Sequence, residues 1–548
     1  MLKKFLKSVV YYGIPQLIVF AVILYFGRPY IKEYLFEYIG ISERSSLFDL
    51  ADIGIDLFLV YIVAYIAFTT IRSKRYYVLT GRSYGADQKF KRSYASLVDY
   101  FKDSDKHKMD TEKFPEMSWR EAKGLVLGKF QKKLITFPAS SETNICIFGP
   151  PGSGKTAGLG IINVISMIHA GGSALVIDIK GDIFNFVSKF FEGKGTRLLR
   201  FCPDDPDAIE KSCHFDPFNG LSEMDATEKK TYIDSMALVL IPDTGGSDGD
   251  YYTKTARKLF CGIAHLLLYE NKNLSFPDLV HAILHGNVFD WVTRGMNSEC
   301  SEASELLSGM YGQSEKNISG AQDCLCTAII NFSNPVLDVL LGKDDPDKCI
   351  SVKNLDKGES IFLQISQEHL DTYAPLFTLI LQTLSMQMTK RPDKSTPEGK
   401  KNRPILMLMD EFPQLTFSYK MINADLSTLR SKVCQIVIIQ QNFSQLSYKY
   451  KVDGARSILG NCDCQVILGS NDYVTSKEWS DKIGTKKVLK LSNSVTMSEH
   501  SSSGNSVSEA REPVFFPEDF GDLGEKKDLV IYYKGKYLKC KKLNCYID

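Results

Sequence analysis

The sequence predicts an α/β fold, in which a P-loop nucleotide-binding domain carries an all-helical insertion and follows two transmembrane helices. Three observations support this prediction. A glycine-rich phosphate-binding motif follows an apolar strand at 144–148, strands and helices alternate around a long stretch of purely helical spacing, and two apolar runs come first. A chain of 548 residues also exceeds one ordinary core. The predicted segments are a membrane hairpin at 1–75, a connector with the first part of the nucleotide-binding domain at 76–220, the insertion at 221–345, and the second part of the domain at 346–548.

Composition limits how the chain could contact nucleic acid and which cysteine sites it could contain. The chain carries 66 Lys and Arg residues against 65 Asp and Glu residues, for a net charge of +1. Contact with nucleic acid must therefore come from a local basic patch or from a pore formed on assembly. Thirteen cysteines are scattered along the chain, and the closest spacings are Cys324-x-Cys326 and Cys462-x-Cys464. This pattern favours reduced thiols in a cytosolic body over a zinc site or a disulfide framework.

Two apolar runs near the start are long enough to cross a bilayer. Residues 9–26 contain no charge, and residues 53–71 contain only Asp56, close to the end of the run. Bulky residues follow the first run, which favours a retained helix over a cleaved signal peptide. Basic residues precede the first run and follow the second, so the positive-inside rule predicts a two-pass protein of the cell membrane with both termini in the cytoplasm.

The motif GPPGSGKT follows the strand at 144–148 and matches G-x-x-x-x-G-K-[ST]. Glycines let the backbone curl so that successive N–H groups point at phosphate oxygens. We expect Lys155 to hold the β- and γ-phosphates and Thr156 to bind Mg²⁺, while the next helix turns its positive end to the anion. A glycine-rich surface turn is the alternative. The predicted nucleotide-binding residues are Gly149, Pro150, Pro151, Gly152, Ser153, Gly154, Lys155 and Thr156.

A second buried strand, at 173–178, ends in polar residues. Asp178, Lys180 and Asp182 come at its carboxyl end, where open α/β sheets place their ligands. An ordinary turn at the end of a strand would also explain them, and both interpretations stay open.

From 225 to 341 apolar residues recur at helical spacing, which predicts the all-helical insertion. A loop rich in Gly and Asp interrupts it at 242–250. The acidic residues Asp243, Asp248 and Asp250 lack the spacing of a calcium loop, so we expect a solvated loop there.

The apolar run at 404–409 ends in Asp410 and Glu411. On a chain with a phosphate-binding loop, such a pair predicts the second half of an NTP-hydrolysing site. Asp410 would hold the Mg²⁺ shell, and Glu411 would orient and deprotonate the attacking water. A pair of surface carboxylates is the alternative, although the run is too apolar for an exposed strand.

The next strand ends in amides and is preceded by an arginine. Gln440 is predicted to sense the γ-phosphate, because an amide both accepts from water and donates to phosphate. Arg430 has two open interpretations: an arginine near a subunit seam that neutralises charge in a neighbour's site, or a solvated side chain.

The last part of the chain contains two polar stretches. The Ser-rich stretch at 492–509 predicts a mobile loop. After a closing strand at 528–533, the basic stretch 534–542 would contact nucleic acid or anionic lipid, and a hairpin with a solvated face explains it equally well.

Taken in order, these parts resemble the coupling proteins of type IV secretion and conjugation systems, TraG-like membrane ATPases related to FtsK-like DNA translocases. The sequences DEFP at 410–413 and QQNFSQL at 440–446 carry the resemblance best. It implies a RecA-like nucleotide-binding domain and a homo-hexameric ring. The implied roles are Walker A for Lys155 and Thr156, Walker B for Asp410 and Glu411, sensor for Gln440, and arginine finger in trans for Arg430.

The resemblance also implies a function and its partners. The chain would be an ATP hydrolase using ATP and Mg²⁺ that delivers a relaxase–DNA complex, effector proteins, or both to the channel of a type IV secretion system, gripping the DNA backbone without sequence preference. A nucleotide-binding membrane receptor that does little work is one alternative, and the intact Glu411 argues against it. A chromosome-segregation translocase is another, and the large helical insertion argues against that.

Overall fold

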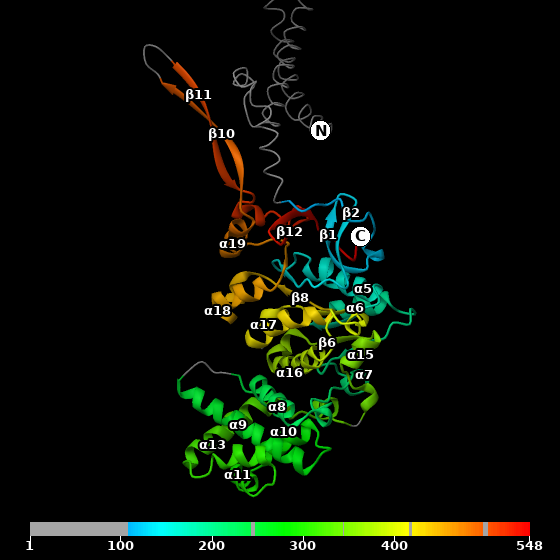
Figure 1. Cartoon of the computed structure of the whole chain (residues 1–548), viewed down its shortest axis with the longest axis vertical. Coiled ribbons are helices and arrows are strands. Elements are labelled where there is room, and N and C mark those ends of the chain that lie inside the picture. Colours follow the sequence, from blue (N-terminus) through cyan, green and yellow to red (C-terminus); the bar gives the residue numbers. More distant parts are fainter. Residues whose placement is uncertain (1–107, 243–246, 344, 416–418, 497–501, 548) are drawn as a thin grey trace, which may run out of the picture. The chain divides into compact units, whose positions relative to one another are not determined.

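The computed structural model describes residues 108–242, 247–343, 345–415, 419–496 and 502–547 (Figure 1). The predicted membrane spans at 9–26 and 53–71 lie outside these residues. Within the described part, no helix combines the length and the apolar character needed to cross a membrane. The chain forms two compact units: the larger comprises His107–Ile483 and Phe515–Asp548, and the other includes Gly484–Val514.

Within the described residues, an 11-stranded sheet organises the larger unit, in the order β2-β1-β13-β12-β9-β3-β8-β7-β4-β6-β5. The seven strands from β9 to β5 in this order run parallel, and the pairs from β2 to β9 are antiparallel. The strands are β1 (Gly124–Phe130), β2 (Lys133–Pro138), β3 (Ile145–Phe148), β4 (Ser173–Asp178), β5 (Leu198–Phe201), β6 (Ser360–Gln364), β7 (Ile405–Met409), β8 (Cys434–Gln440), β9 (Cys464–Ile467), β12 (Asp528–Tyr533) and β13 (Lys536–Lys541).

The central strands form the core. Every residue of β3, β4, β7, β8 and β9 is buried. Continuous apolar runs of this kind form parallel strands that crossover helices cover on both faces. The carboxyl ends of parallel strands share one edge of the sheet, so the segments that follow β3, β4, β7 and β8 meet there. The predicted α/β class is confirmed.

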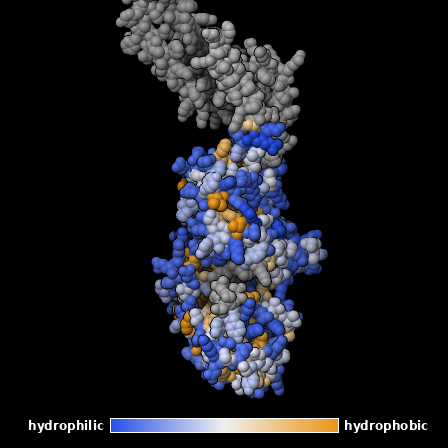
Figure 2. Space-filling view, turned by 90° about the vertical axis from the view of Figure 1, so that its left-hand side faces the viewer, coloured by the Kyte–Doolittle hydropathy of each residue, from blue (hydrophilic) through white to orange (hydrophobic). Residues whose placement is uncertain are grey.

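Helices complete the larger unit around this sheet. They are η4 (Thr156–Gly160, a π-helical turn), α5 (Ile161–His169), α6 (Asp182–Phe190), α7 (Ala208–Lys211), α15 (Val352–Lys357), α16 (Leu370–Thr389), α17 (Tyr419–Thr428), η11 (Leu429–Lys432), α18 (Phe443–Gly460) and α19 (Tyr473–Ile483). On the face shown in Figure 2, hydrophobic side chains form small groups within a mostly hydrophilic surface. On this face, therefore, few apolar side chains are exposed together.

Seven α-helices of the described residues lie between α7 and α15, and Figure 1 draws them in green. They are α8 (Ala226–Leu240), α9 (Ser247–Glu270), α10 (Phe276–His285), α11 (Val288–Met296), α12 (Ser301–Ser308), α13 (Glu315–Ile329) and α14 (Pro335–Leu340). Asp225 caps α8 by accepting from the Glu228 N–H, and Ser275 with Asp278 forms a capping box on α10. Helix α9 begins at Ser247, so Asp248 and Asp250 belong to a helix and not to the predicted loop.

The Ser-rich stretch forms a hairpin of β10 (Thr485–Thr496) and β11 (Ser502–Pro513), with Thr485 opposite Pro513 and Thr496 opposite Ser502. The prediction of a mobile loop over 492–509 is wrong for the strands of this hairpin. Low hydrophobicity argues against a packed core, but two antiparallel strands can pair through the N–H and C=O groups that face each other without one.

Candidate functional site

The phosphate-binding motif forms one tight turn between β3 and the helix η4. Gly152 and Gly154 have φ values of 74° and 86°. These left-handed conformations are strained for residues with a Cβ, so both positions require glycine. The turn ends at a helix start, where free N–H groups and the helix dipole favour an anion. The sequence-predicted residues from Gly149 to Thr156 therefore lie in one turn whose geometry suits an anion.

Lys155 is buried inside this turn. Its ammonium donates to the carbonyl oxygens of Gly149 at 2.7 Å and Pro150 at 3.2 Å. Burial lowers the pKa of Lys155, and the nearby carboxylates of Glu411 and Asp410 oppose that effect. The turn thus holds a cation beside the two predicted Walker B carboxylates.

Asp410 follows β7 and contacts the phosphate-binding turn. The Thr156 hydroxyl donates to Oδ2 of Asp410 at 3.3 Å, although 254 residues separate the two in sequence. Burial, together with the negative charges of Glu411 and Asp178, raises the pKa of Asp410 to about 6. The predicted metal ligands therefore lie together.

Asp178 ends the neighbouring strand β4 and lies close enough to Asp410 for its charge to act on that carboxyl group. Its Oδ2 accepts from the Phe184 N–H at 2.8 Å, while Oδ1 is buried without a partner in the described residues. Burial raises the pKa of Asp178 to about 6. Two buried carboxyl groups and a hydroxyl are the hard oxygen donors that suit Mg²⁺. Within the described part, no group of three or more His, Cys, Asp and Glu residues is arranged to hold a metal ion.

Glu411 stands at the start of the turn after β7, with φ 48° and ψ 42°. A left-handed conformation is uncommon for glutamate and persists only where the surroundings hold it. Its backbone N–H donates to Oδ1 of Asp410 at 3.1 Å, and its Oε2 accepts from Nε2 of Gln441 at 3.3 Å. The side chain of Gln441 therefore orients the predicted water-activating carboxylate.

Gln440, the predicted sensor, faces the other way. Its side chain is fully buried, and its Nε2 donates to Sγ of Cys146 on β3 at 3.1 Å. Successive residues of a strand point to opposite faces of the sheet, so only one of the two adjacent amides reaches Glu411. The structure brings Gln441 to the site and not Gln440, and the pair of adjacent glutamines in the sequence does not by itself distinguish the two.

Arg430 lies at the other edge of the sheet. It belongs to η11, just before β8, whereas Lys155 follows the carboxyl end of the parallel strand β3. Its guanidinium pairs with Asp463 at 2.9 Å. The structure therefore does not bring Arg430 to the phosphate-binding turn of its own chain.

Two further residues, from α18, support the Glu411 turn. The Lys449 ammonium donates to the carbonyl oxygen of Pro413 at 3.1 Å, and burial lowers the pKa of Lys449 to about 8. The Tyr450 ring stacks on Phe412, with centroids 5.8 Å apart and planes 17° apart. The sequence of α18 by itself does not single out either residue for these contacts.

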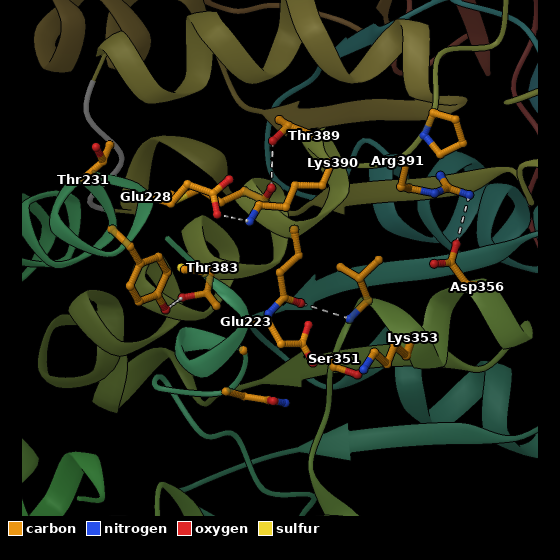
Figure 3. A pocket seen from close by; sticks show the side chains of 18 of the residues that line it. Glu223, Glu228, Thr231, Ser351, Lys353, Asp356, Thr383, Thr389, Lys390 and Arg391 are labelled. Carbon is orange, nitrogen blue, oxygen red and sulfur yellow. Dashed lines mark hydrogen bonds and ion pairs between the residues drawn. The ribbon is translucent and has the colours of Figure 1, made fainter. Parts of the chain in front are cut away.

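A cavity of about 580 Å³ lies between α8, α15 and α16 (Figure 3). Two ion pairs involve its lining: Lys390 with Glu228 at 3.2 Å, and Arg391 with Asp356 at 3.1 Å. None of the sequence-predicted site residues lines it. The charged groups of the phosphate-binding turn therefore define the candidate site, and this cavity is a separate feature.

Comparison with known families gives a match over most of the chain. The family model described as "Type IV secretory system Conjugative DNA transfer" matches residues 102–548. VirD4 of Rhizobium rhizogenes is 24% identical over 409 residues, which cover 73% of this chain and 58% of that protein. VirD4 of Agrobacterium fabrum (strain C58) is 23% identical over the same shares. The chain thus spans about 58% of the length of the curated relatives it matches.

Solved structures of the plasmid coupling protein TrwB share the fold. The unbound monoclinic form of the bacterial conjugative coupling protein TrwBdeltaN70 has a TM-score of 0.59 and 17% identity, covering 78% of this chain and 89% of that chain. TrwB in complex with a non-hydrolysable ATP analogue has a TM-score of 0.59 and 17% identity, covering 79% and 92%. TrwB with ADP and Mg²⁺ has a TM-score of 0.56 and 17% identity, covering 74% and 86%.

Proposed function

The chain belongs to the type IV secretory system conjugative DNA transfer family, and on that premise we propose that it is a membrane-anchored ATPase that drives transfer. It couples relaxase-bound single-stranded DNA, proteins, or both to a secretion channel. The contact of Thr156 with Asp410, beside Lys155 and Glu411, carries the proposal. It joins two sequence motifs into one phosphate and metal site.

Nucleotide binding uses the phosphate-binding turn. The backbone N–H groups of 149–156 and the Lys155 ammonium hold the phosphates. Thr156 and Asp410 would hold Mg²⁺, which when bound would offset the negative charge of the phosphate oxygens during hydrolysis. The TrwB structures with an ATP analogue and with ADP and Mg²⁺ support this choice of ligand.

Hydrolysis depends on the Glu411 turn. Glu411 accepts a proton from the attacking water, and Gln441 holds the carboxylate in place through the bond to its Oε2. Lys449 and Tyr450 brace the same turn from α18. Gln440 acts indirectly, by tying β8 to the strand that leads into the phosphate-binding turn.

Assembly and location follow the family. The chain forms a homo-hexamer in which Arg430 reaches the nucleotide of a neighbouring subunit, since it lies at the sheet edge away from its own Lys155. The two apolar runs at 9–26 and 53–71 anchor it in the cell membrane with both termini in the cytoplasm. Its partners are the channel proteins, a relaxase–DNA complex or effector proteins, and the DNA backbone.

Hydrolysis by the purified full chain tests the motor. We expect single-stranded DNA to stimulate the wild-type chain and Glu411→Gln to lose most of its activity while still binding nucleotide. A wild-type rate no higher than that of Glu411→Gln would contradict the motor and favour a nucleotide-binding receptor. Plasmid mobilisation in cells that carry only Lys155→Ala tests the coupling role, and undiminished transfer would contradict it.

A further inference from the structure

The segment 542–547, which follows β13, packs on the helix that leaves the phosphate-binding turn. The backbone N–H of Cys545 donates to the Ala157 carbonyl at 3.2 Å. Leu543 and Cys545 are 5% and 2% exposed. The Tyr546 ring meets Phe186 of α6 edge-on, with centroids 5.1 Å apart. This segment therefore packs as an integral part of the larger unit, against η4 and α6.

Gly158 allows this close approach. The Leu543 carbonyl oxygen lies 2.5 Å from the position that a Cβ on Gly158 would occupy. Glycine is unfavourable inside a helix, so its presence there is explained by the packing of the segment. A side chain at 158 would push Leu543, and with it Lys542, away from the turn.

Lys542 contacts the phosphate-binding turn itself. Its ammonium donates to the Ser153 carbonyl oxygen at 3.2 Å. Ser153 lies between Gly152 and Gly154, whose φ values are 74° and 86°. In a trans peptide the C=O and the next N–H point in opposite directions. Holding the Ser153 carbonyl toward Lys542 therefore turns the Gly154 N–H to the opposite side of that peptide.

The neighbouring lysines differ from Lys542. Lys539 pairs with Asp528 at 3.4 Å, and Lys541 also pairs with Asp528. Lys542 is held against the turn instead. Burial lowers the pKa of Lys542 to about 8, so the Lys542 side chain stays mostly charged at pH 7 and adds a cation at the Ser153 carbonyl of the turn.

We propose that Lys542 is a positioning residue of the nucleotide site, which fixes the Ser153–Gly154 peptide so that its N–H faces the phosphates of a nucleoside di- or triphosphate. This inference rests on the proposed nucleotide binding. It assigns to one residue of the basic stretch a role in the site, in place of a contact with nucleic acid or lipid.

The test measures binding of the fluorescent probe mant-ADP, with Mg²⁺, to the full chain. Lys542→Met keeps the length of the side chain and removes the charged donor, so we expect Kd to rise about tenfold. Lys542→Arg should restore most of the affinity. The matched control Lys539→Met should bind like wild type. In hydrolysis, KM for ATP should rise while kcat stays within about twofold, which a merely structural role would not produce.

The outcomes separate this inference from the proposed function. If the wild-type chain does not bind mant-ADP, the proposed nucleotide binding fails. If it binds and folded Lys542→Met binds equally well, only the role of Lys542 fails. If Lys542→Met does not fold, Gly158→Ala provides a second test, because the added Cβ would displace Leu543 and Lys542 from the turn. Unchanged mant-ADP affinity in that variant would overturn the inference.

Discussion

The amide of Gln441 donates from Nε2 to Oε2 of Glu411 at 3.3 Å, whereas the adjacent Gln440 donates to Sγ of Cys146. Glu411 occupies a left-handed backbone conformation, so contacts from other elements must hold it. Gln441 supplies such a contact from the position directly after β8. The pair links the proposed general base to the strand beside the phosphate-binding turn.

Gln441→Ala should lower kcat for ATP hydrolysis about 10- to 100-fold, because general-base catalysis depends on the orientation of the carboxylate. Nucleotide affinity should change little. The matched variant Gln440→Ala should mainly lower the thermal unfolding midpoint, since it removes a fully buried side chain. Steady-state kinetics and mant-ADP binding check the first variant, and thermal unfolding checks the second. A larger kcat loss in Gln440→Ala than in Gln441→Ala would reverse the assignment.

Lys449→Met should lower kcat several-fold without weakening nucleotide binding. The variant keeps the apolar stem but loses the bond to the Pro413 carbonyl that braces the Glu411 turn. Lys477→Met, at an exposed position on α19, is the control. Equal hydrolysis rates in the wild type and Lys449→Met would show that α18 does not support the catalytic turn.

Arg430→Ala should abolish most ATP hydrolysis. Because Arg430 lies away from Lys155 of its own chain, we expect this loss to arise in the site of a neighbouring subunit. Co-expression of Arg430→Ala with Lys155→Ala then forms some sites with an intact Lys155 from one subunit and an intact Arg430 from the next. We expect the mixed assemblies to recover part of the wild-type rate, measured as ATP hydrolysis of the co-purified protein. A mixture as inactive as either variant alone would exclude a role in trans.

Asp425→Asn should stabilise the protein above neutral pH. Burial raises the pKa of Asp425 in the folded protein to about 7, with a smaller opposing effect of the nearby Ser385 hydroxyl. The folded state therefore binds the proton more tightly than the unfolded state, and the wild type loses stability as pH rises from about 4 to about 7. The gain at pH 8.5 should be roughly 1–4 kcal/mol.

Thermal unfolding at pH 5 and pH 8.5 checks this pH dependence. The advantage of Asp425→Asn over the wild type should be large at pH 8.5 and small at pH 5. Asp453→Asn, at an exposed position on α18, serves as the control and should show no such difference. An equal difference in unfolding midpoint at both pH values would show that the substitution acts through side-chain packing and not through the protonation of Asp425.

The sequence by itself determined the α/β class and the two halves of the candidate site. The turn at 149–156 and the carboxylates Asp410 and Glu411 are local patterns, and parallel strands bring their carboxyl ends to one edge, as the contact of Thr156 with Asp410 shows. The predicted membrane spans and the trans role of Arg430 remain predictions.

Only the tertiary structure decided which side chains reach that edge. The choice between Gln440 and Gln441 depends on which face of β8 turns toward Glu411, and both residues fit the sequence pattern equally well. Lys542 meets Ser153 across 389 residues, and Lys449 meets the Pro413 carbonyl from a helix whose own sequence gives no sign of the contact. Such contacts depend on how distant segments pack, which local patterns of residues do not encode.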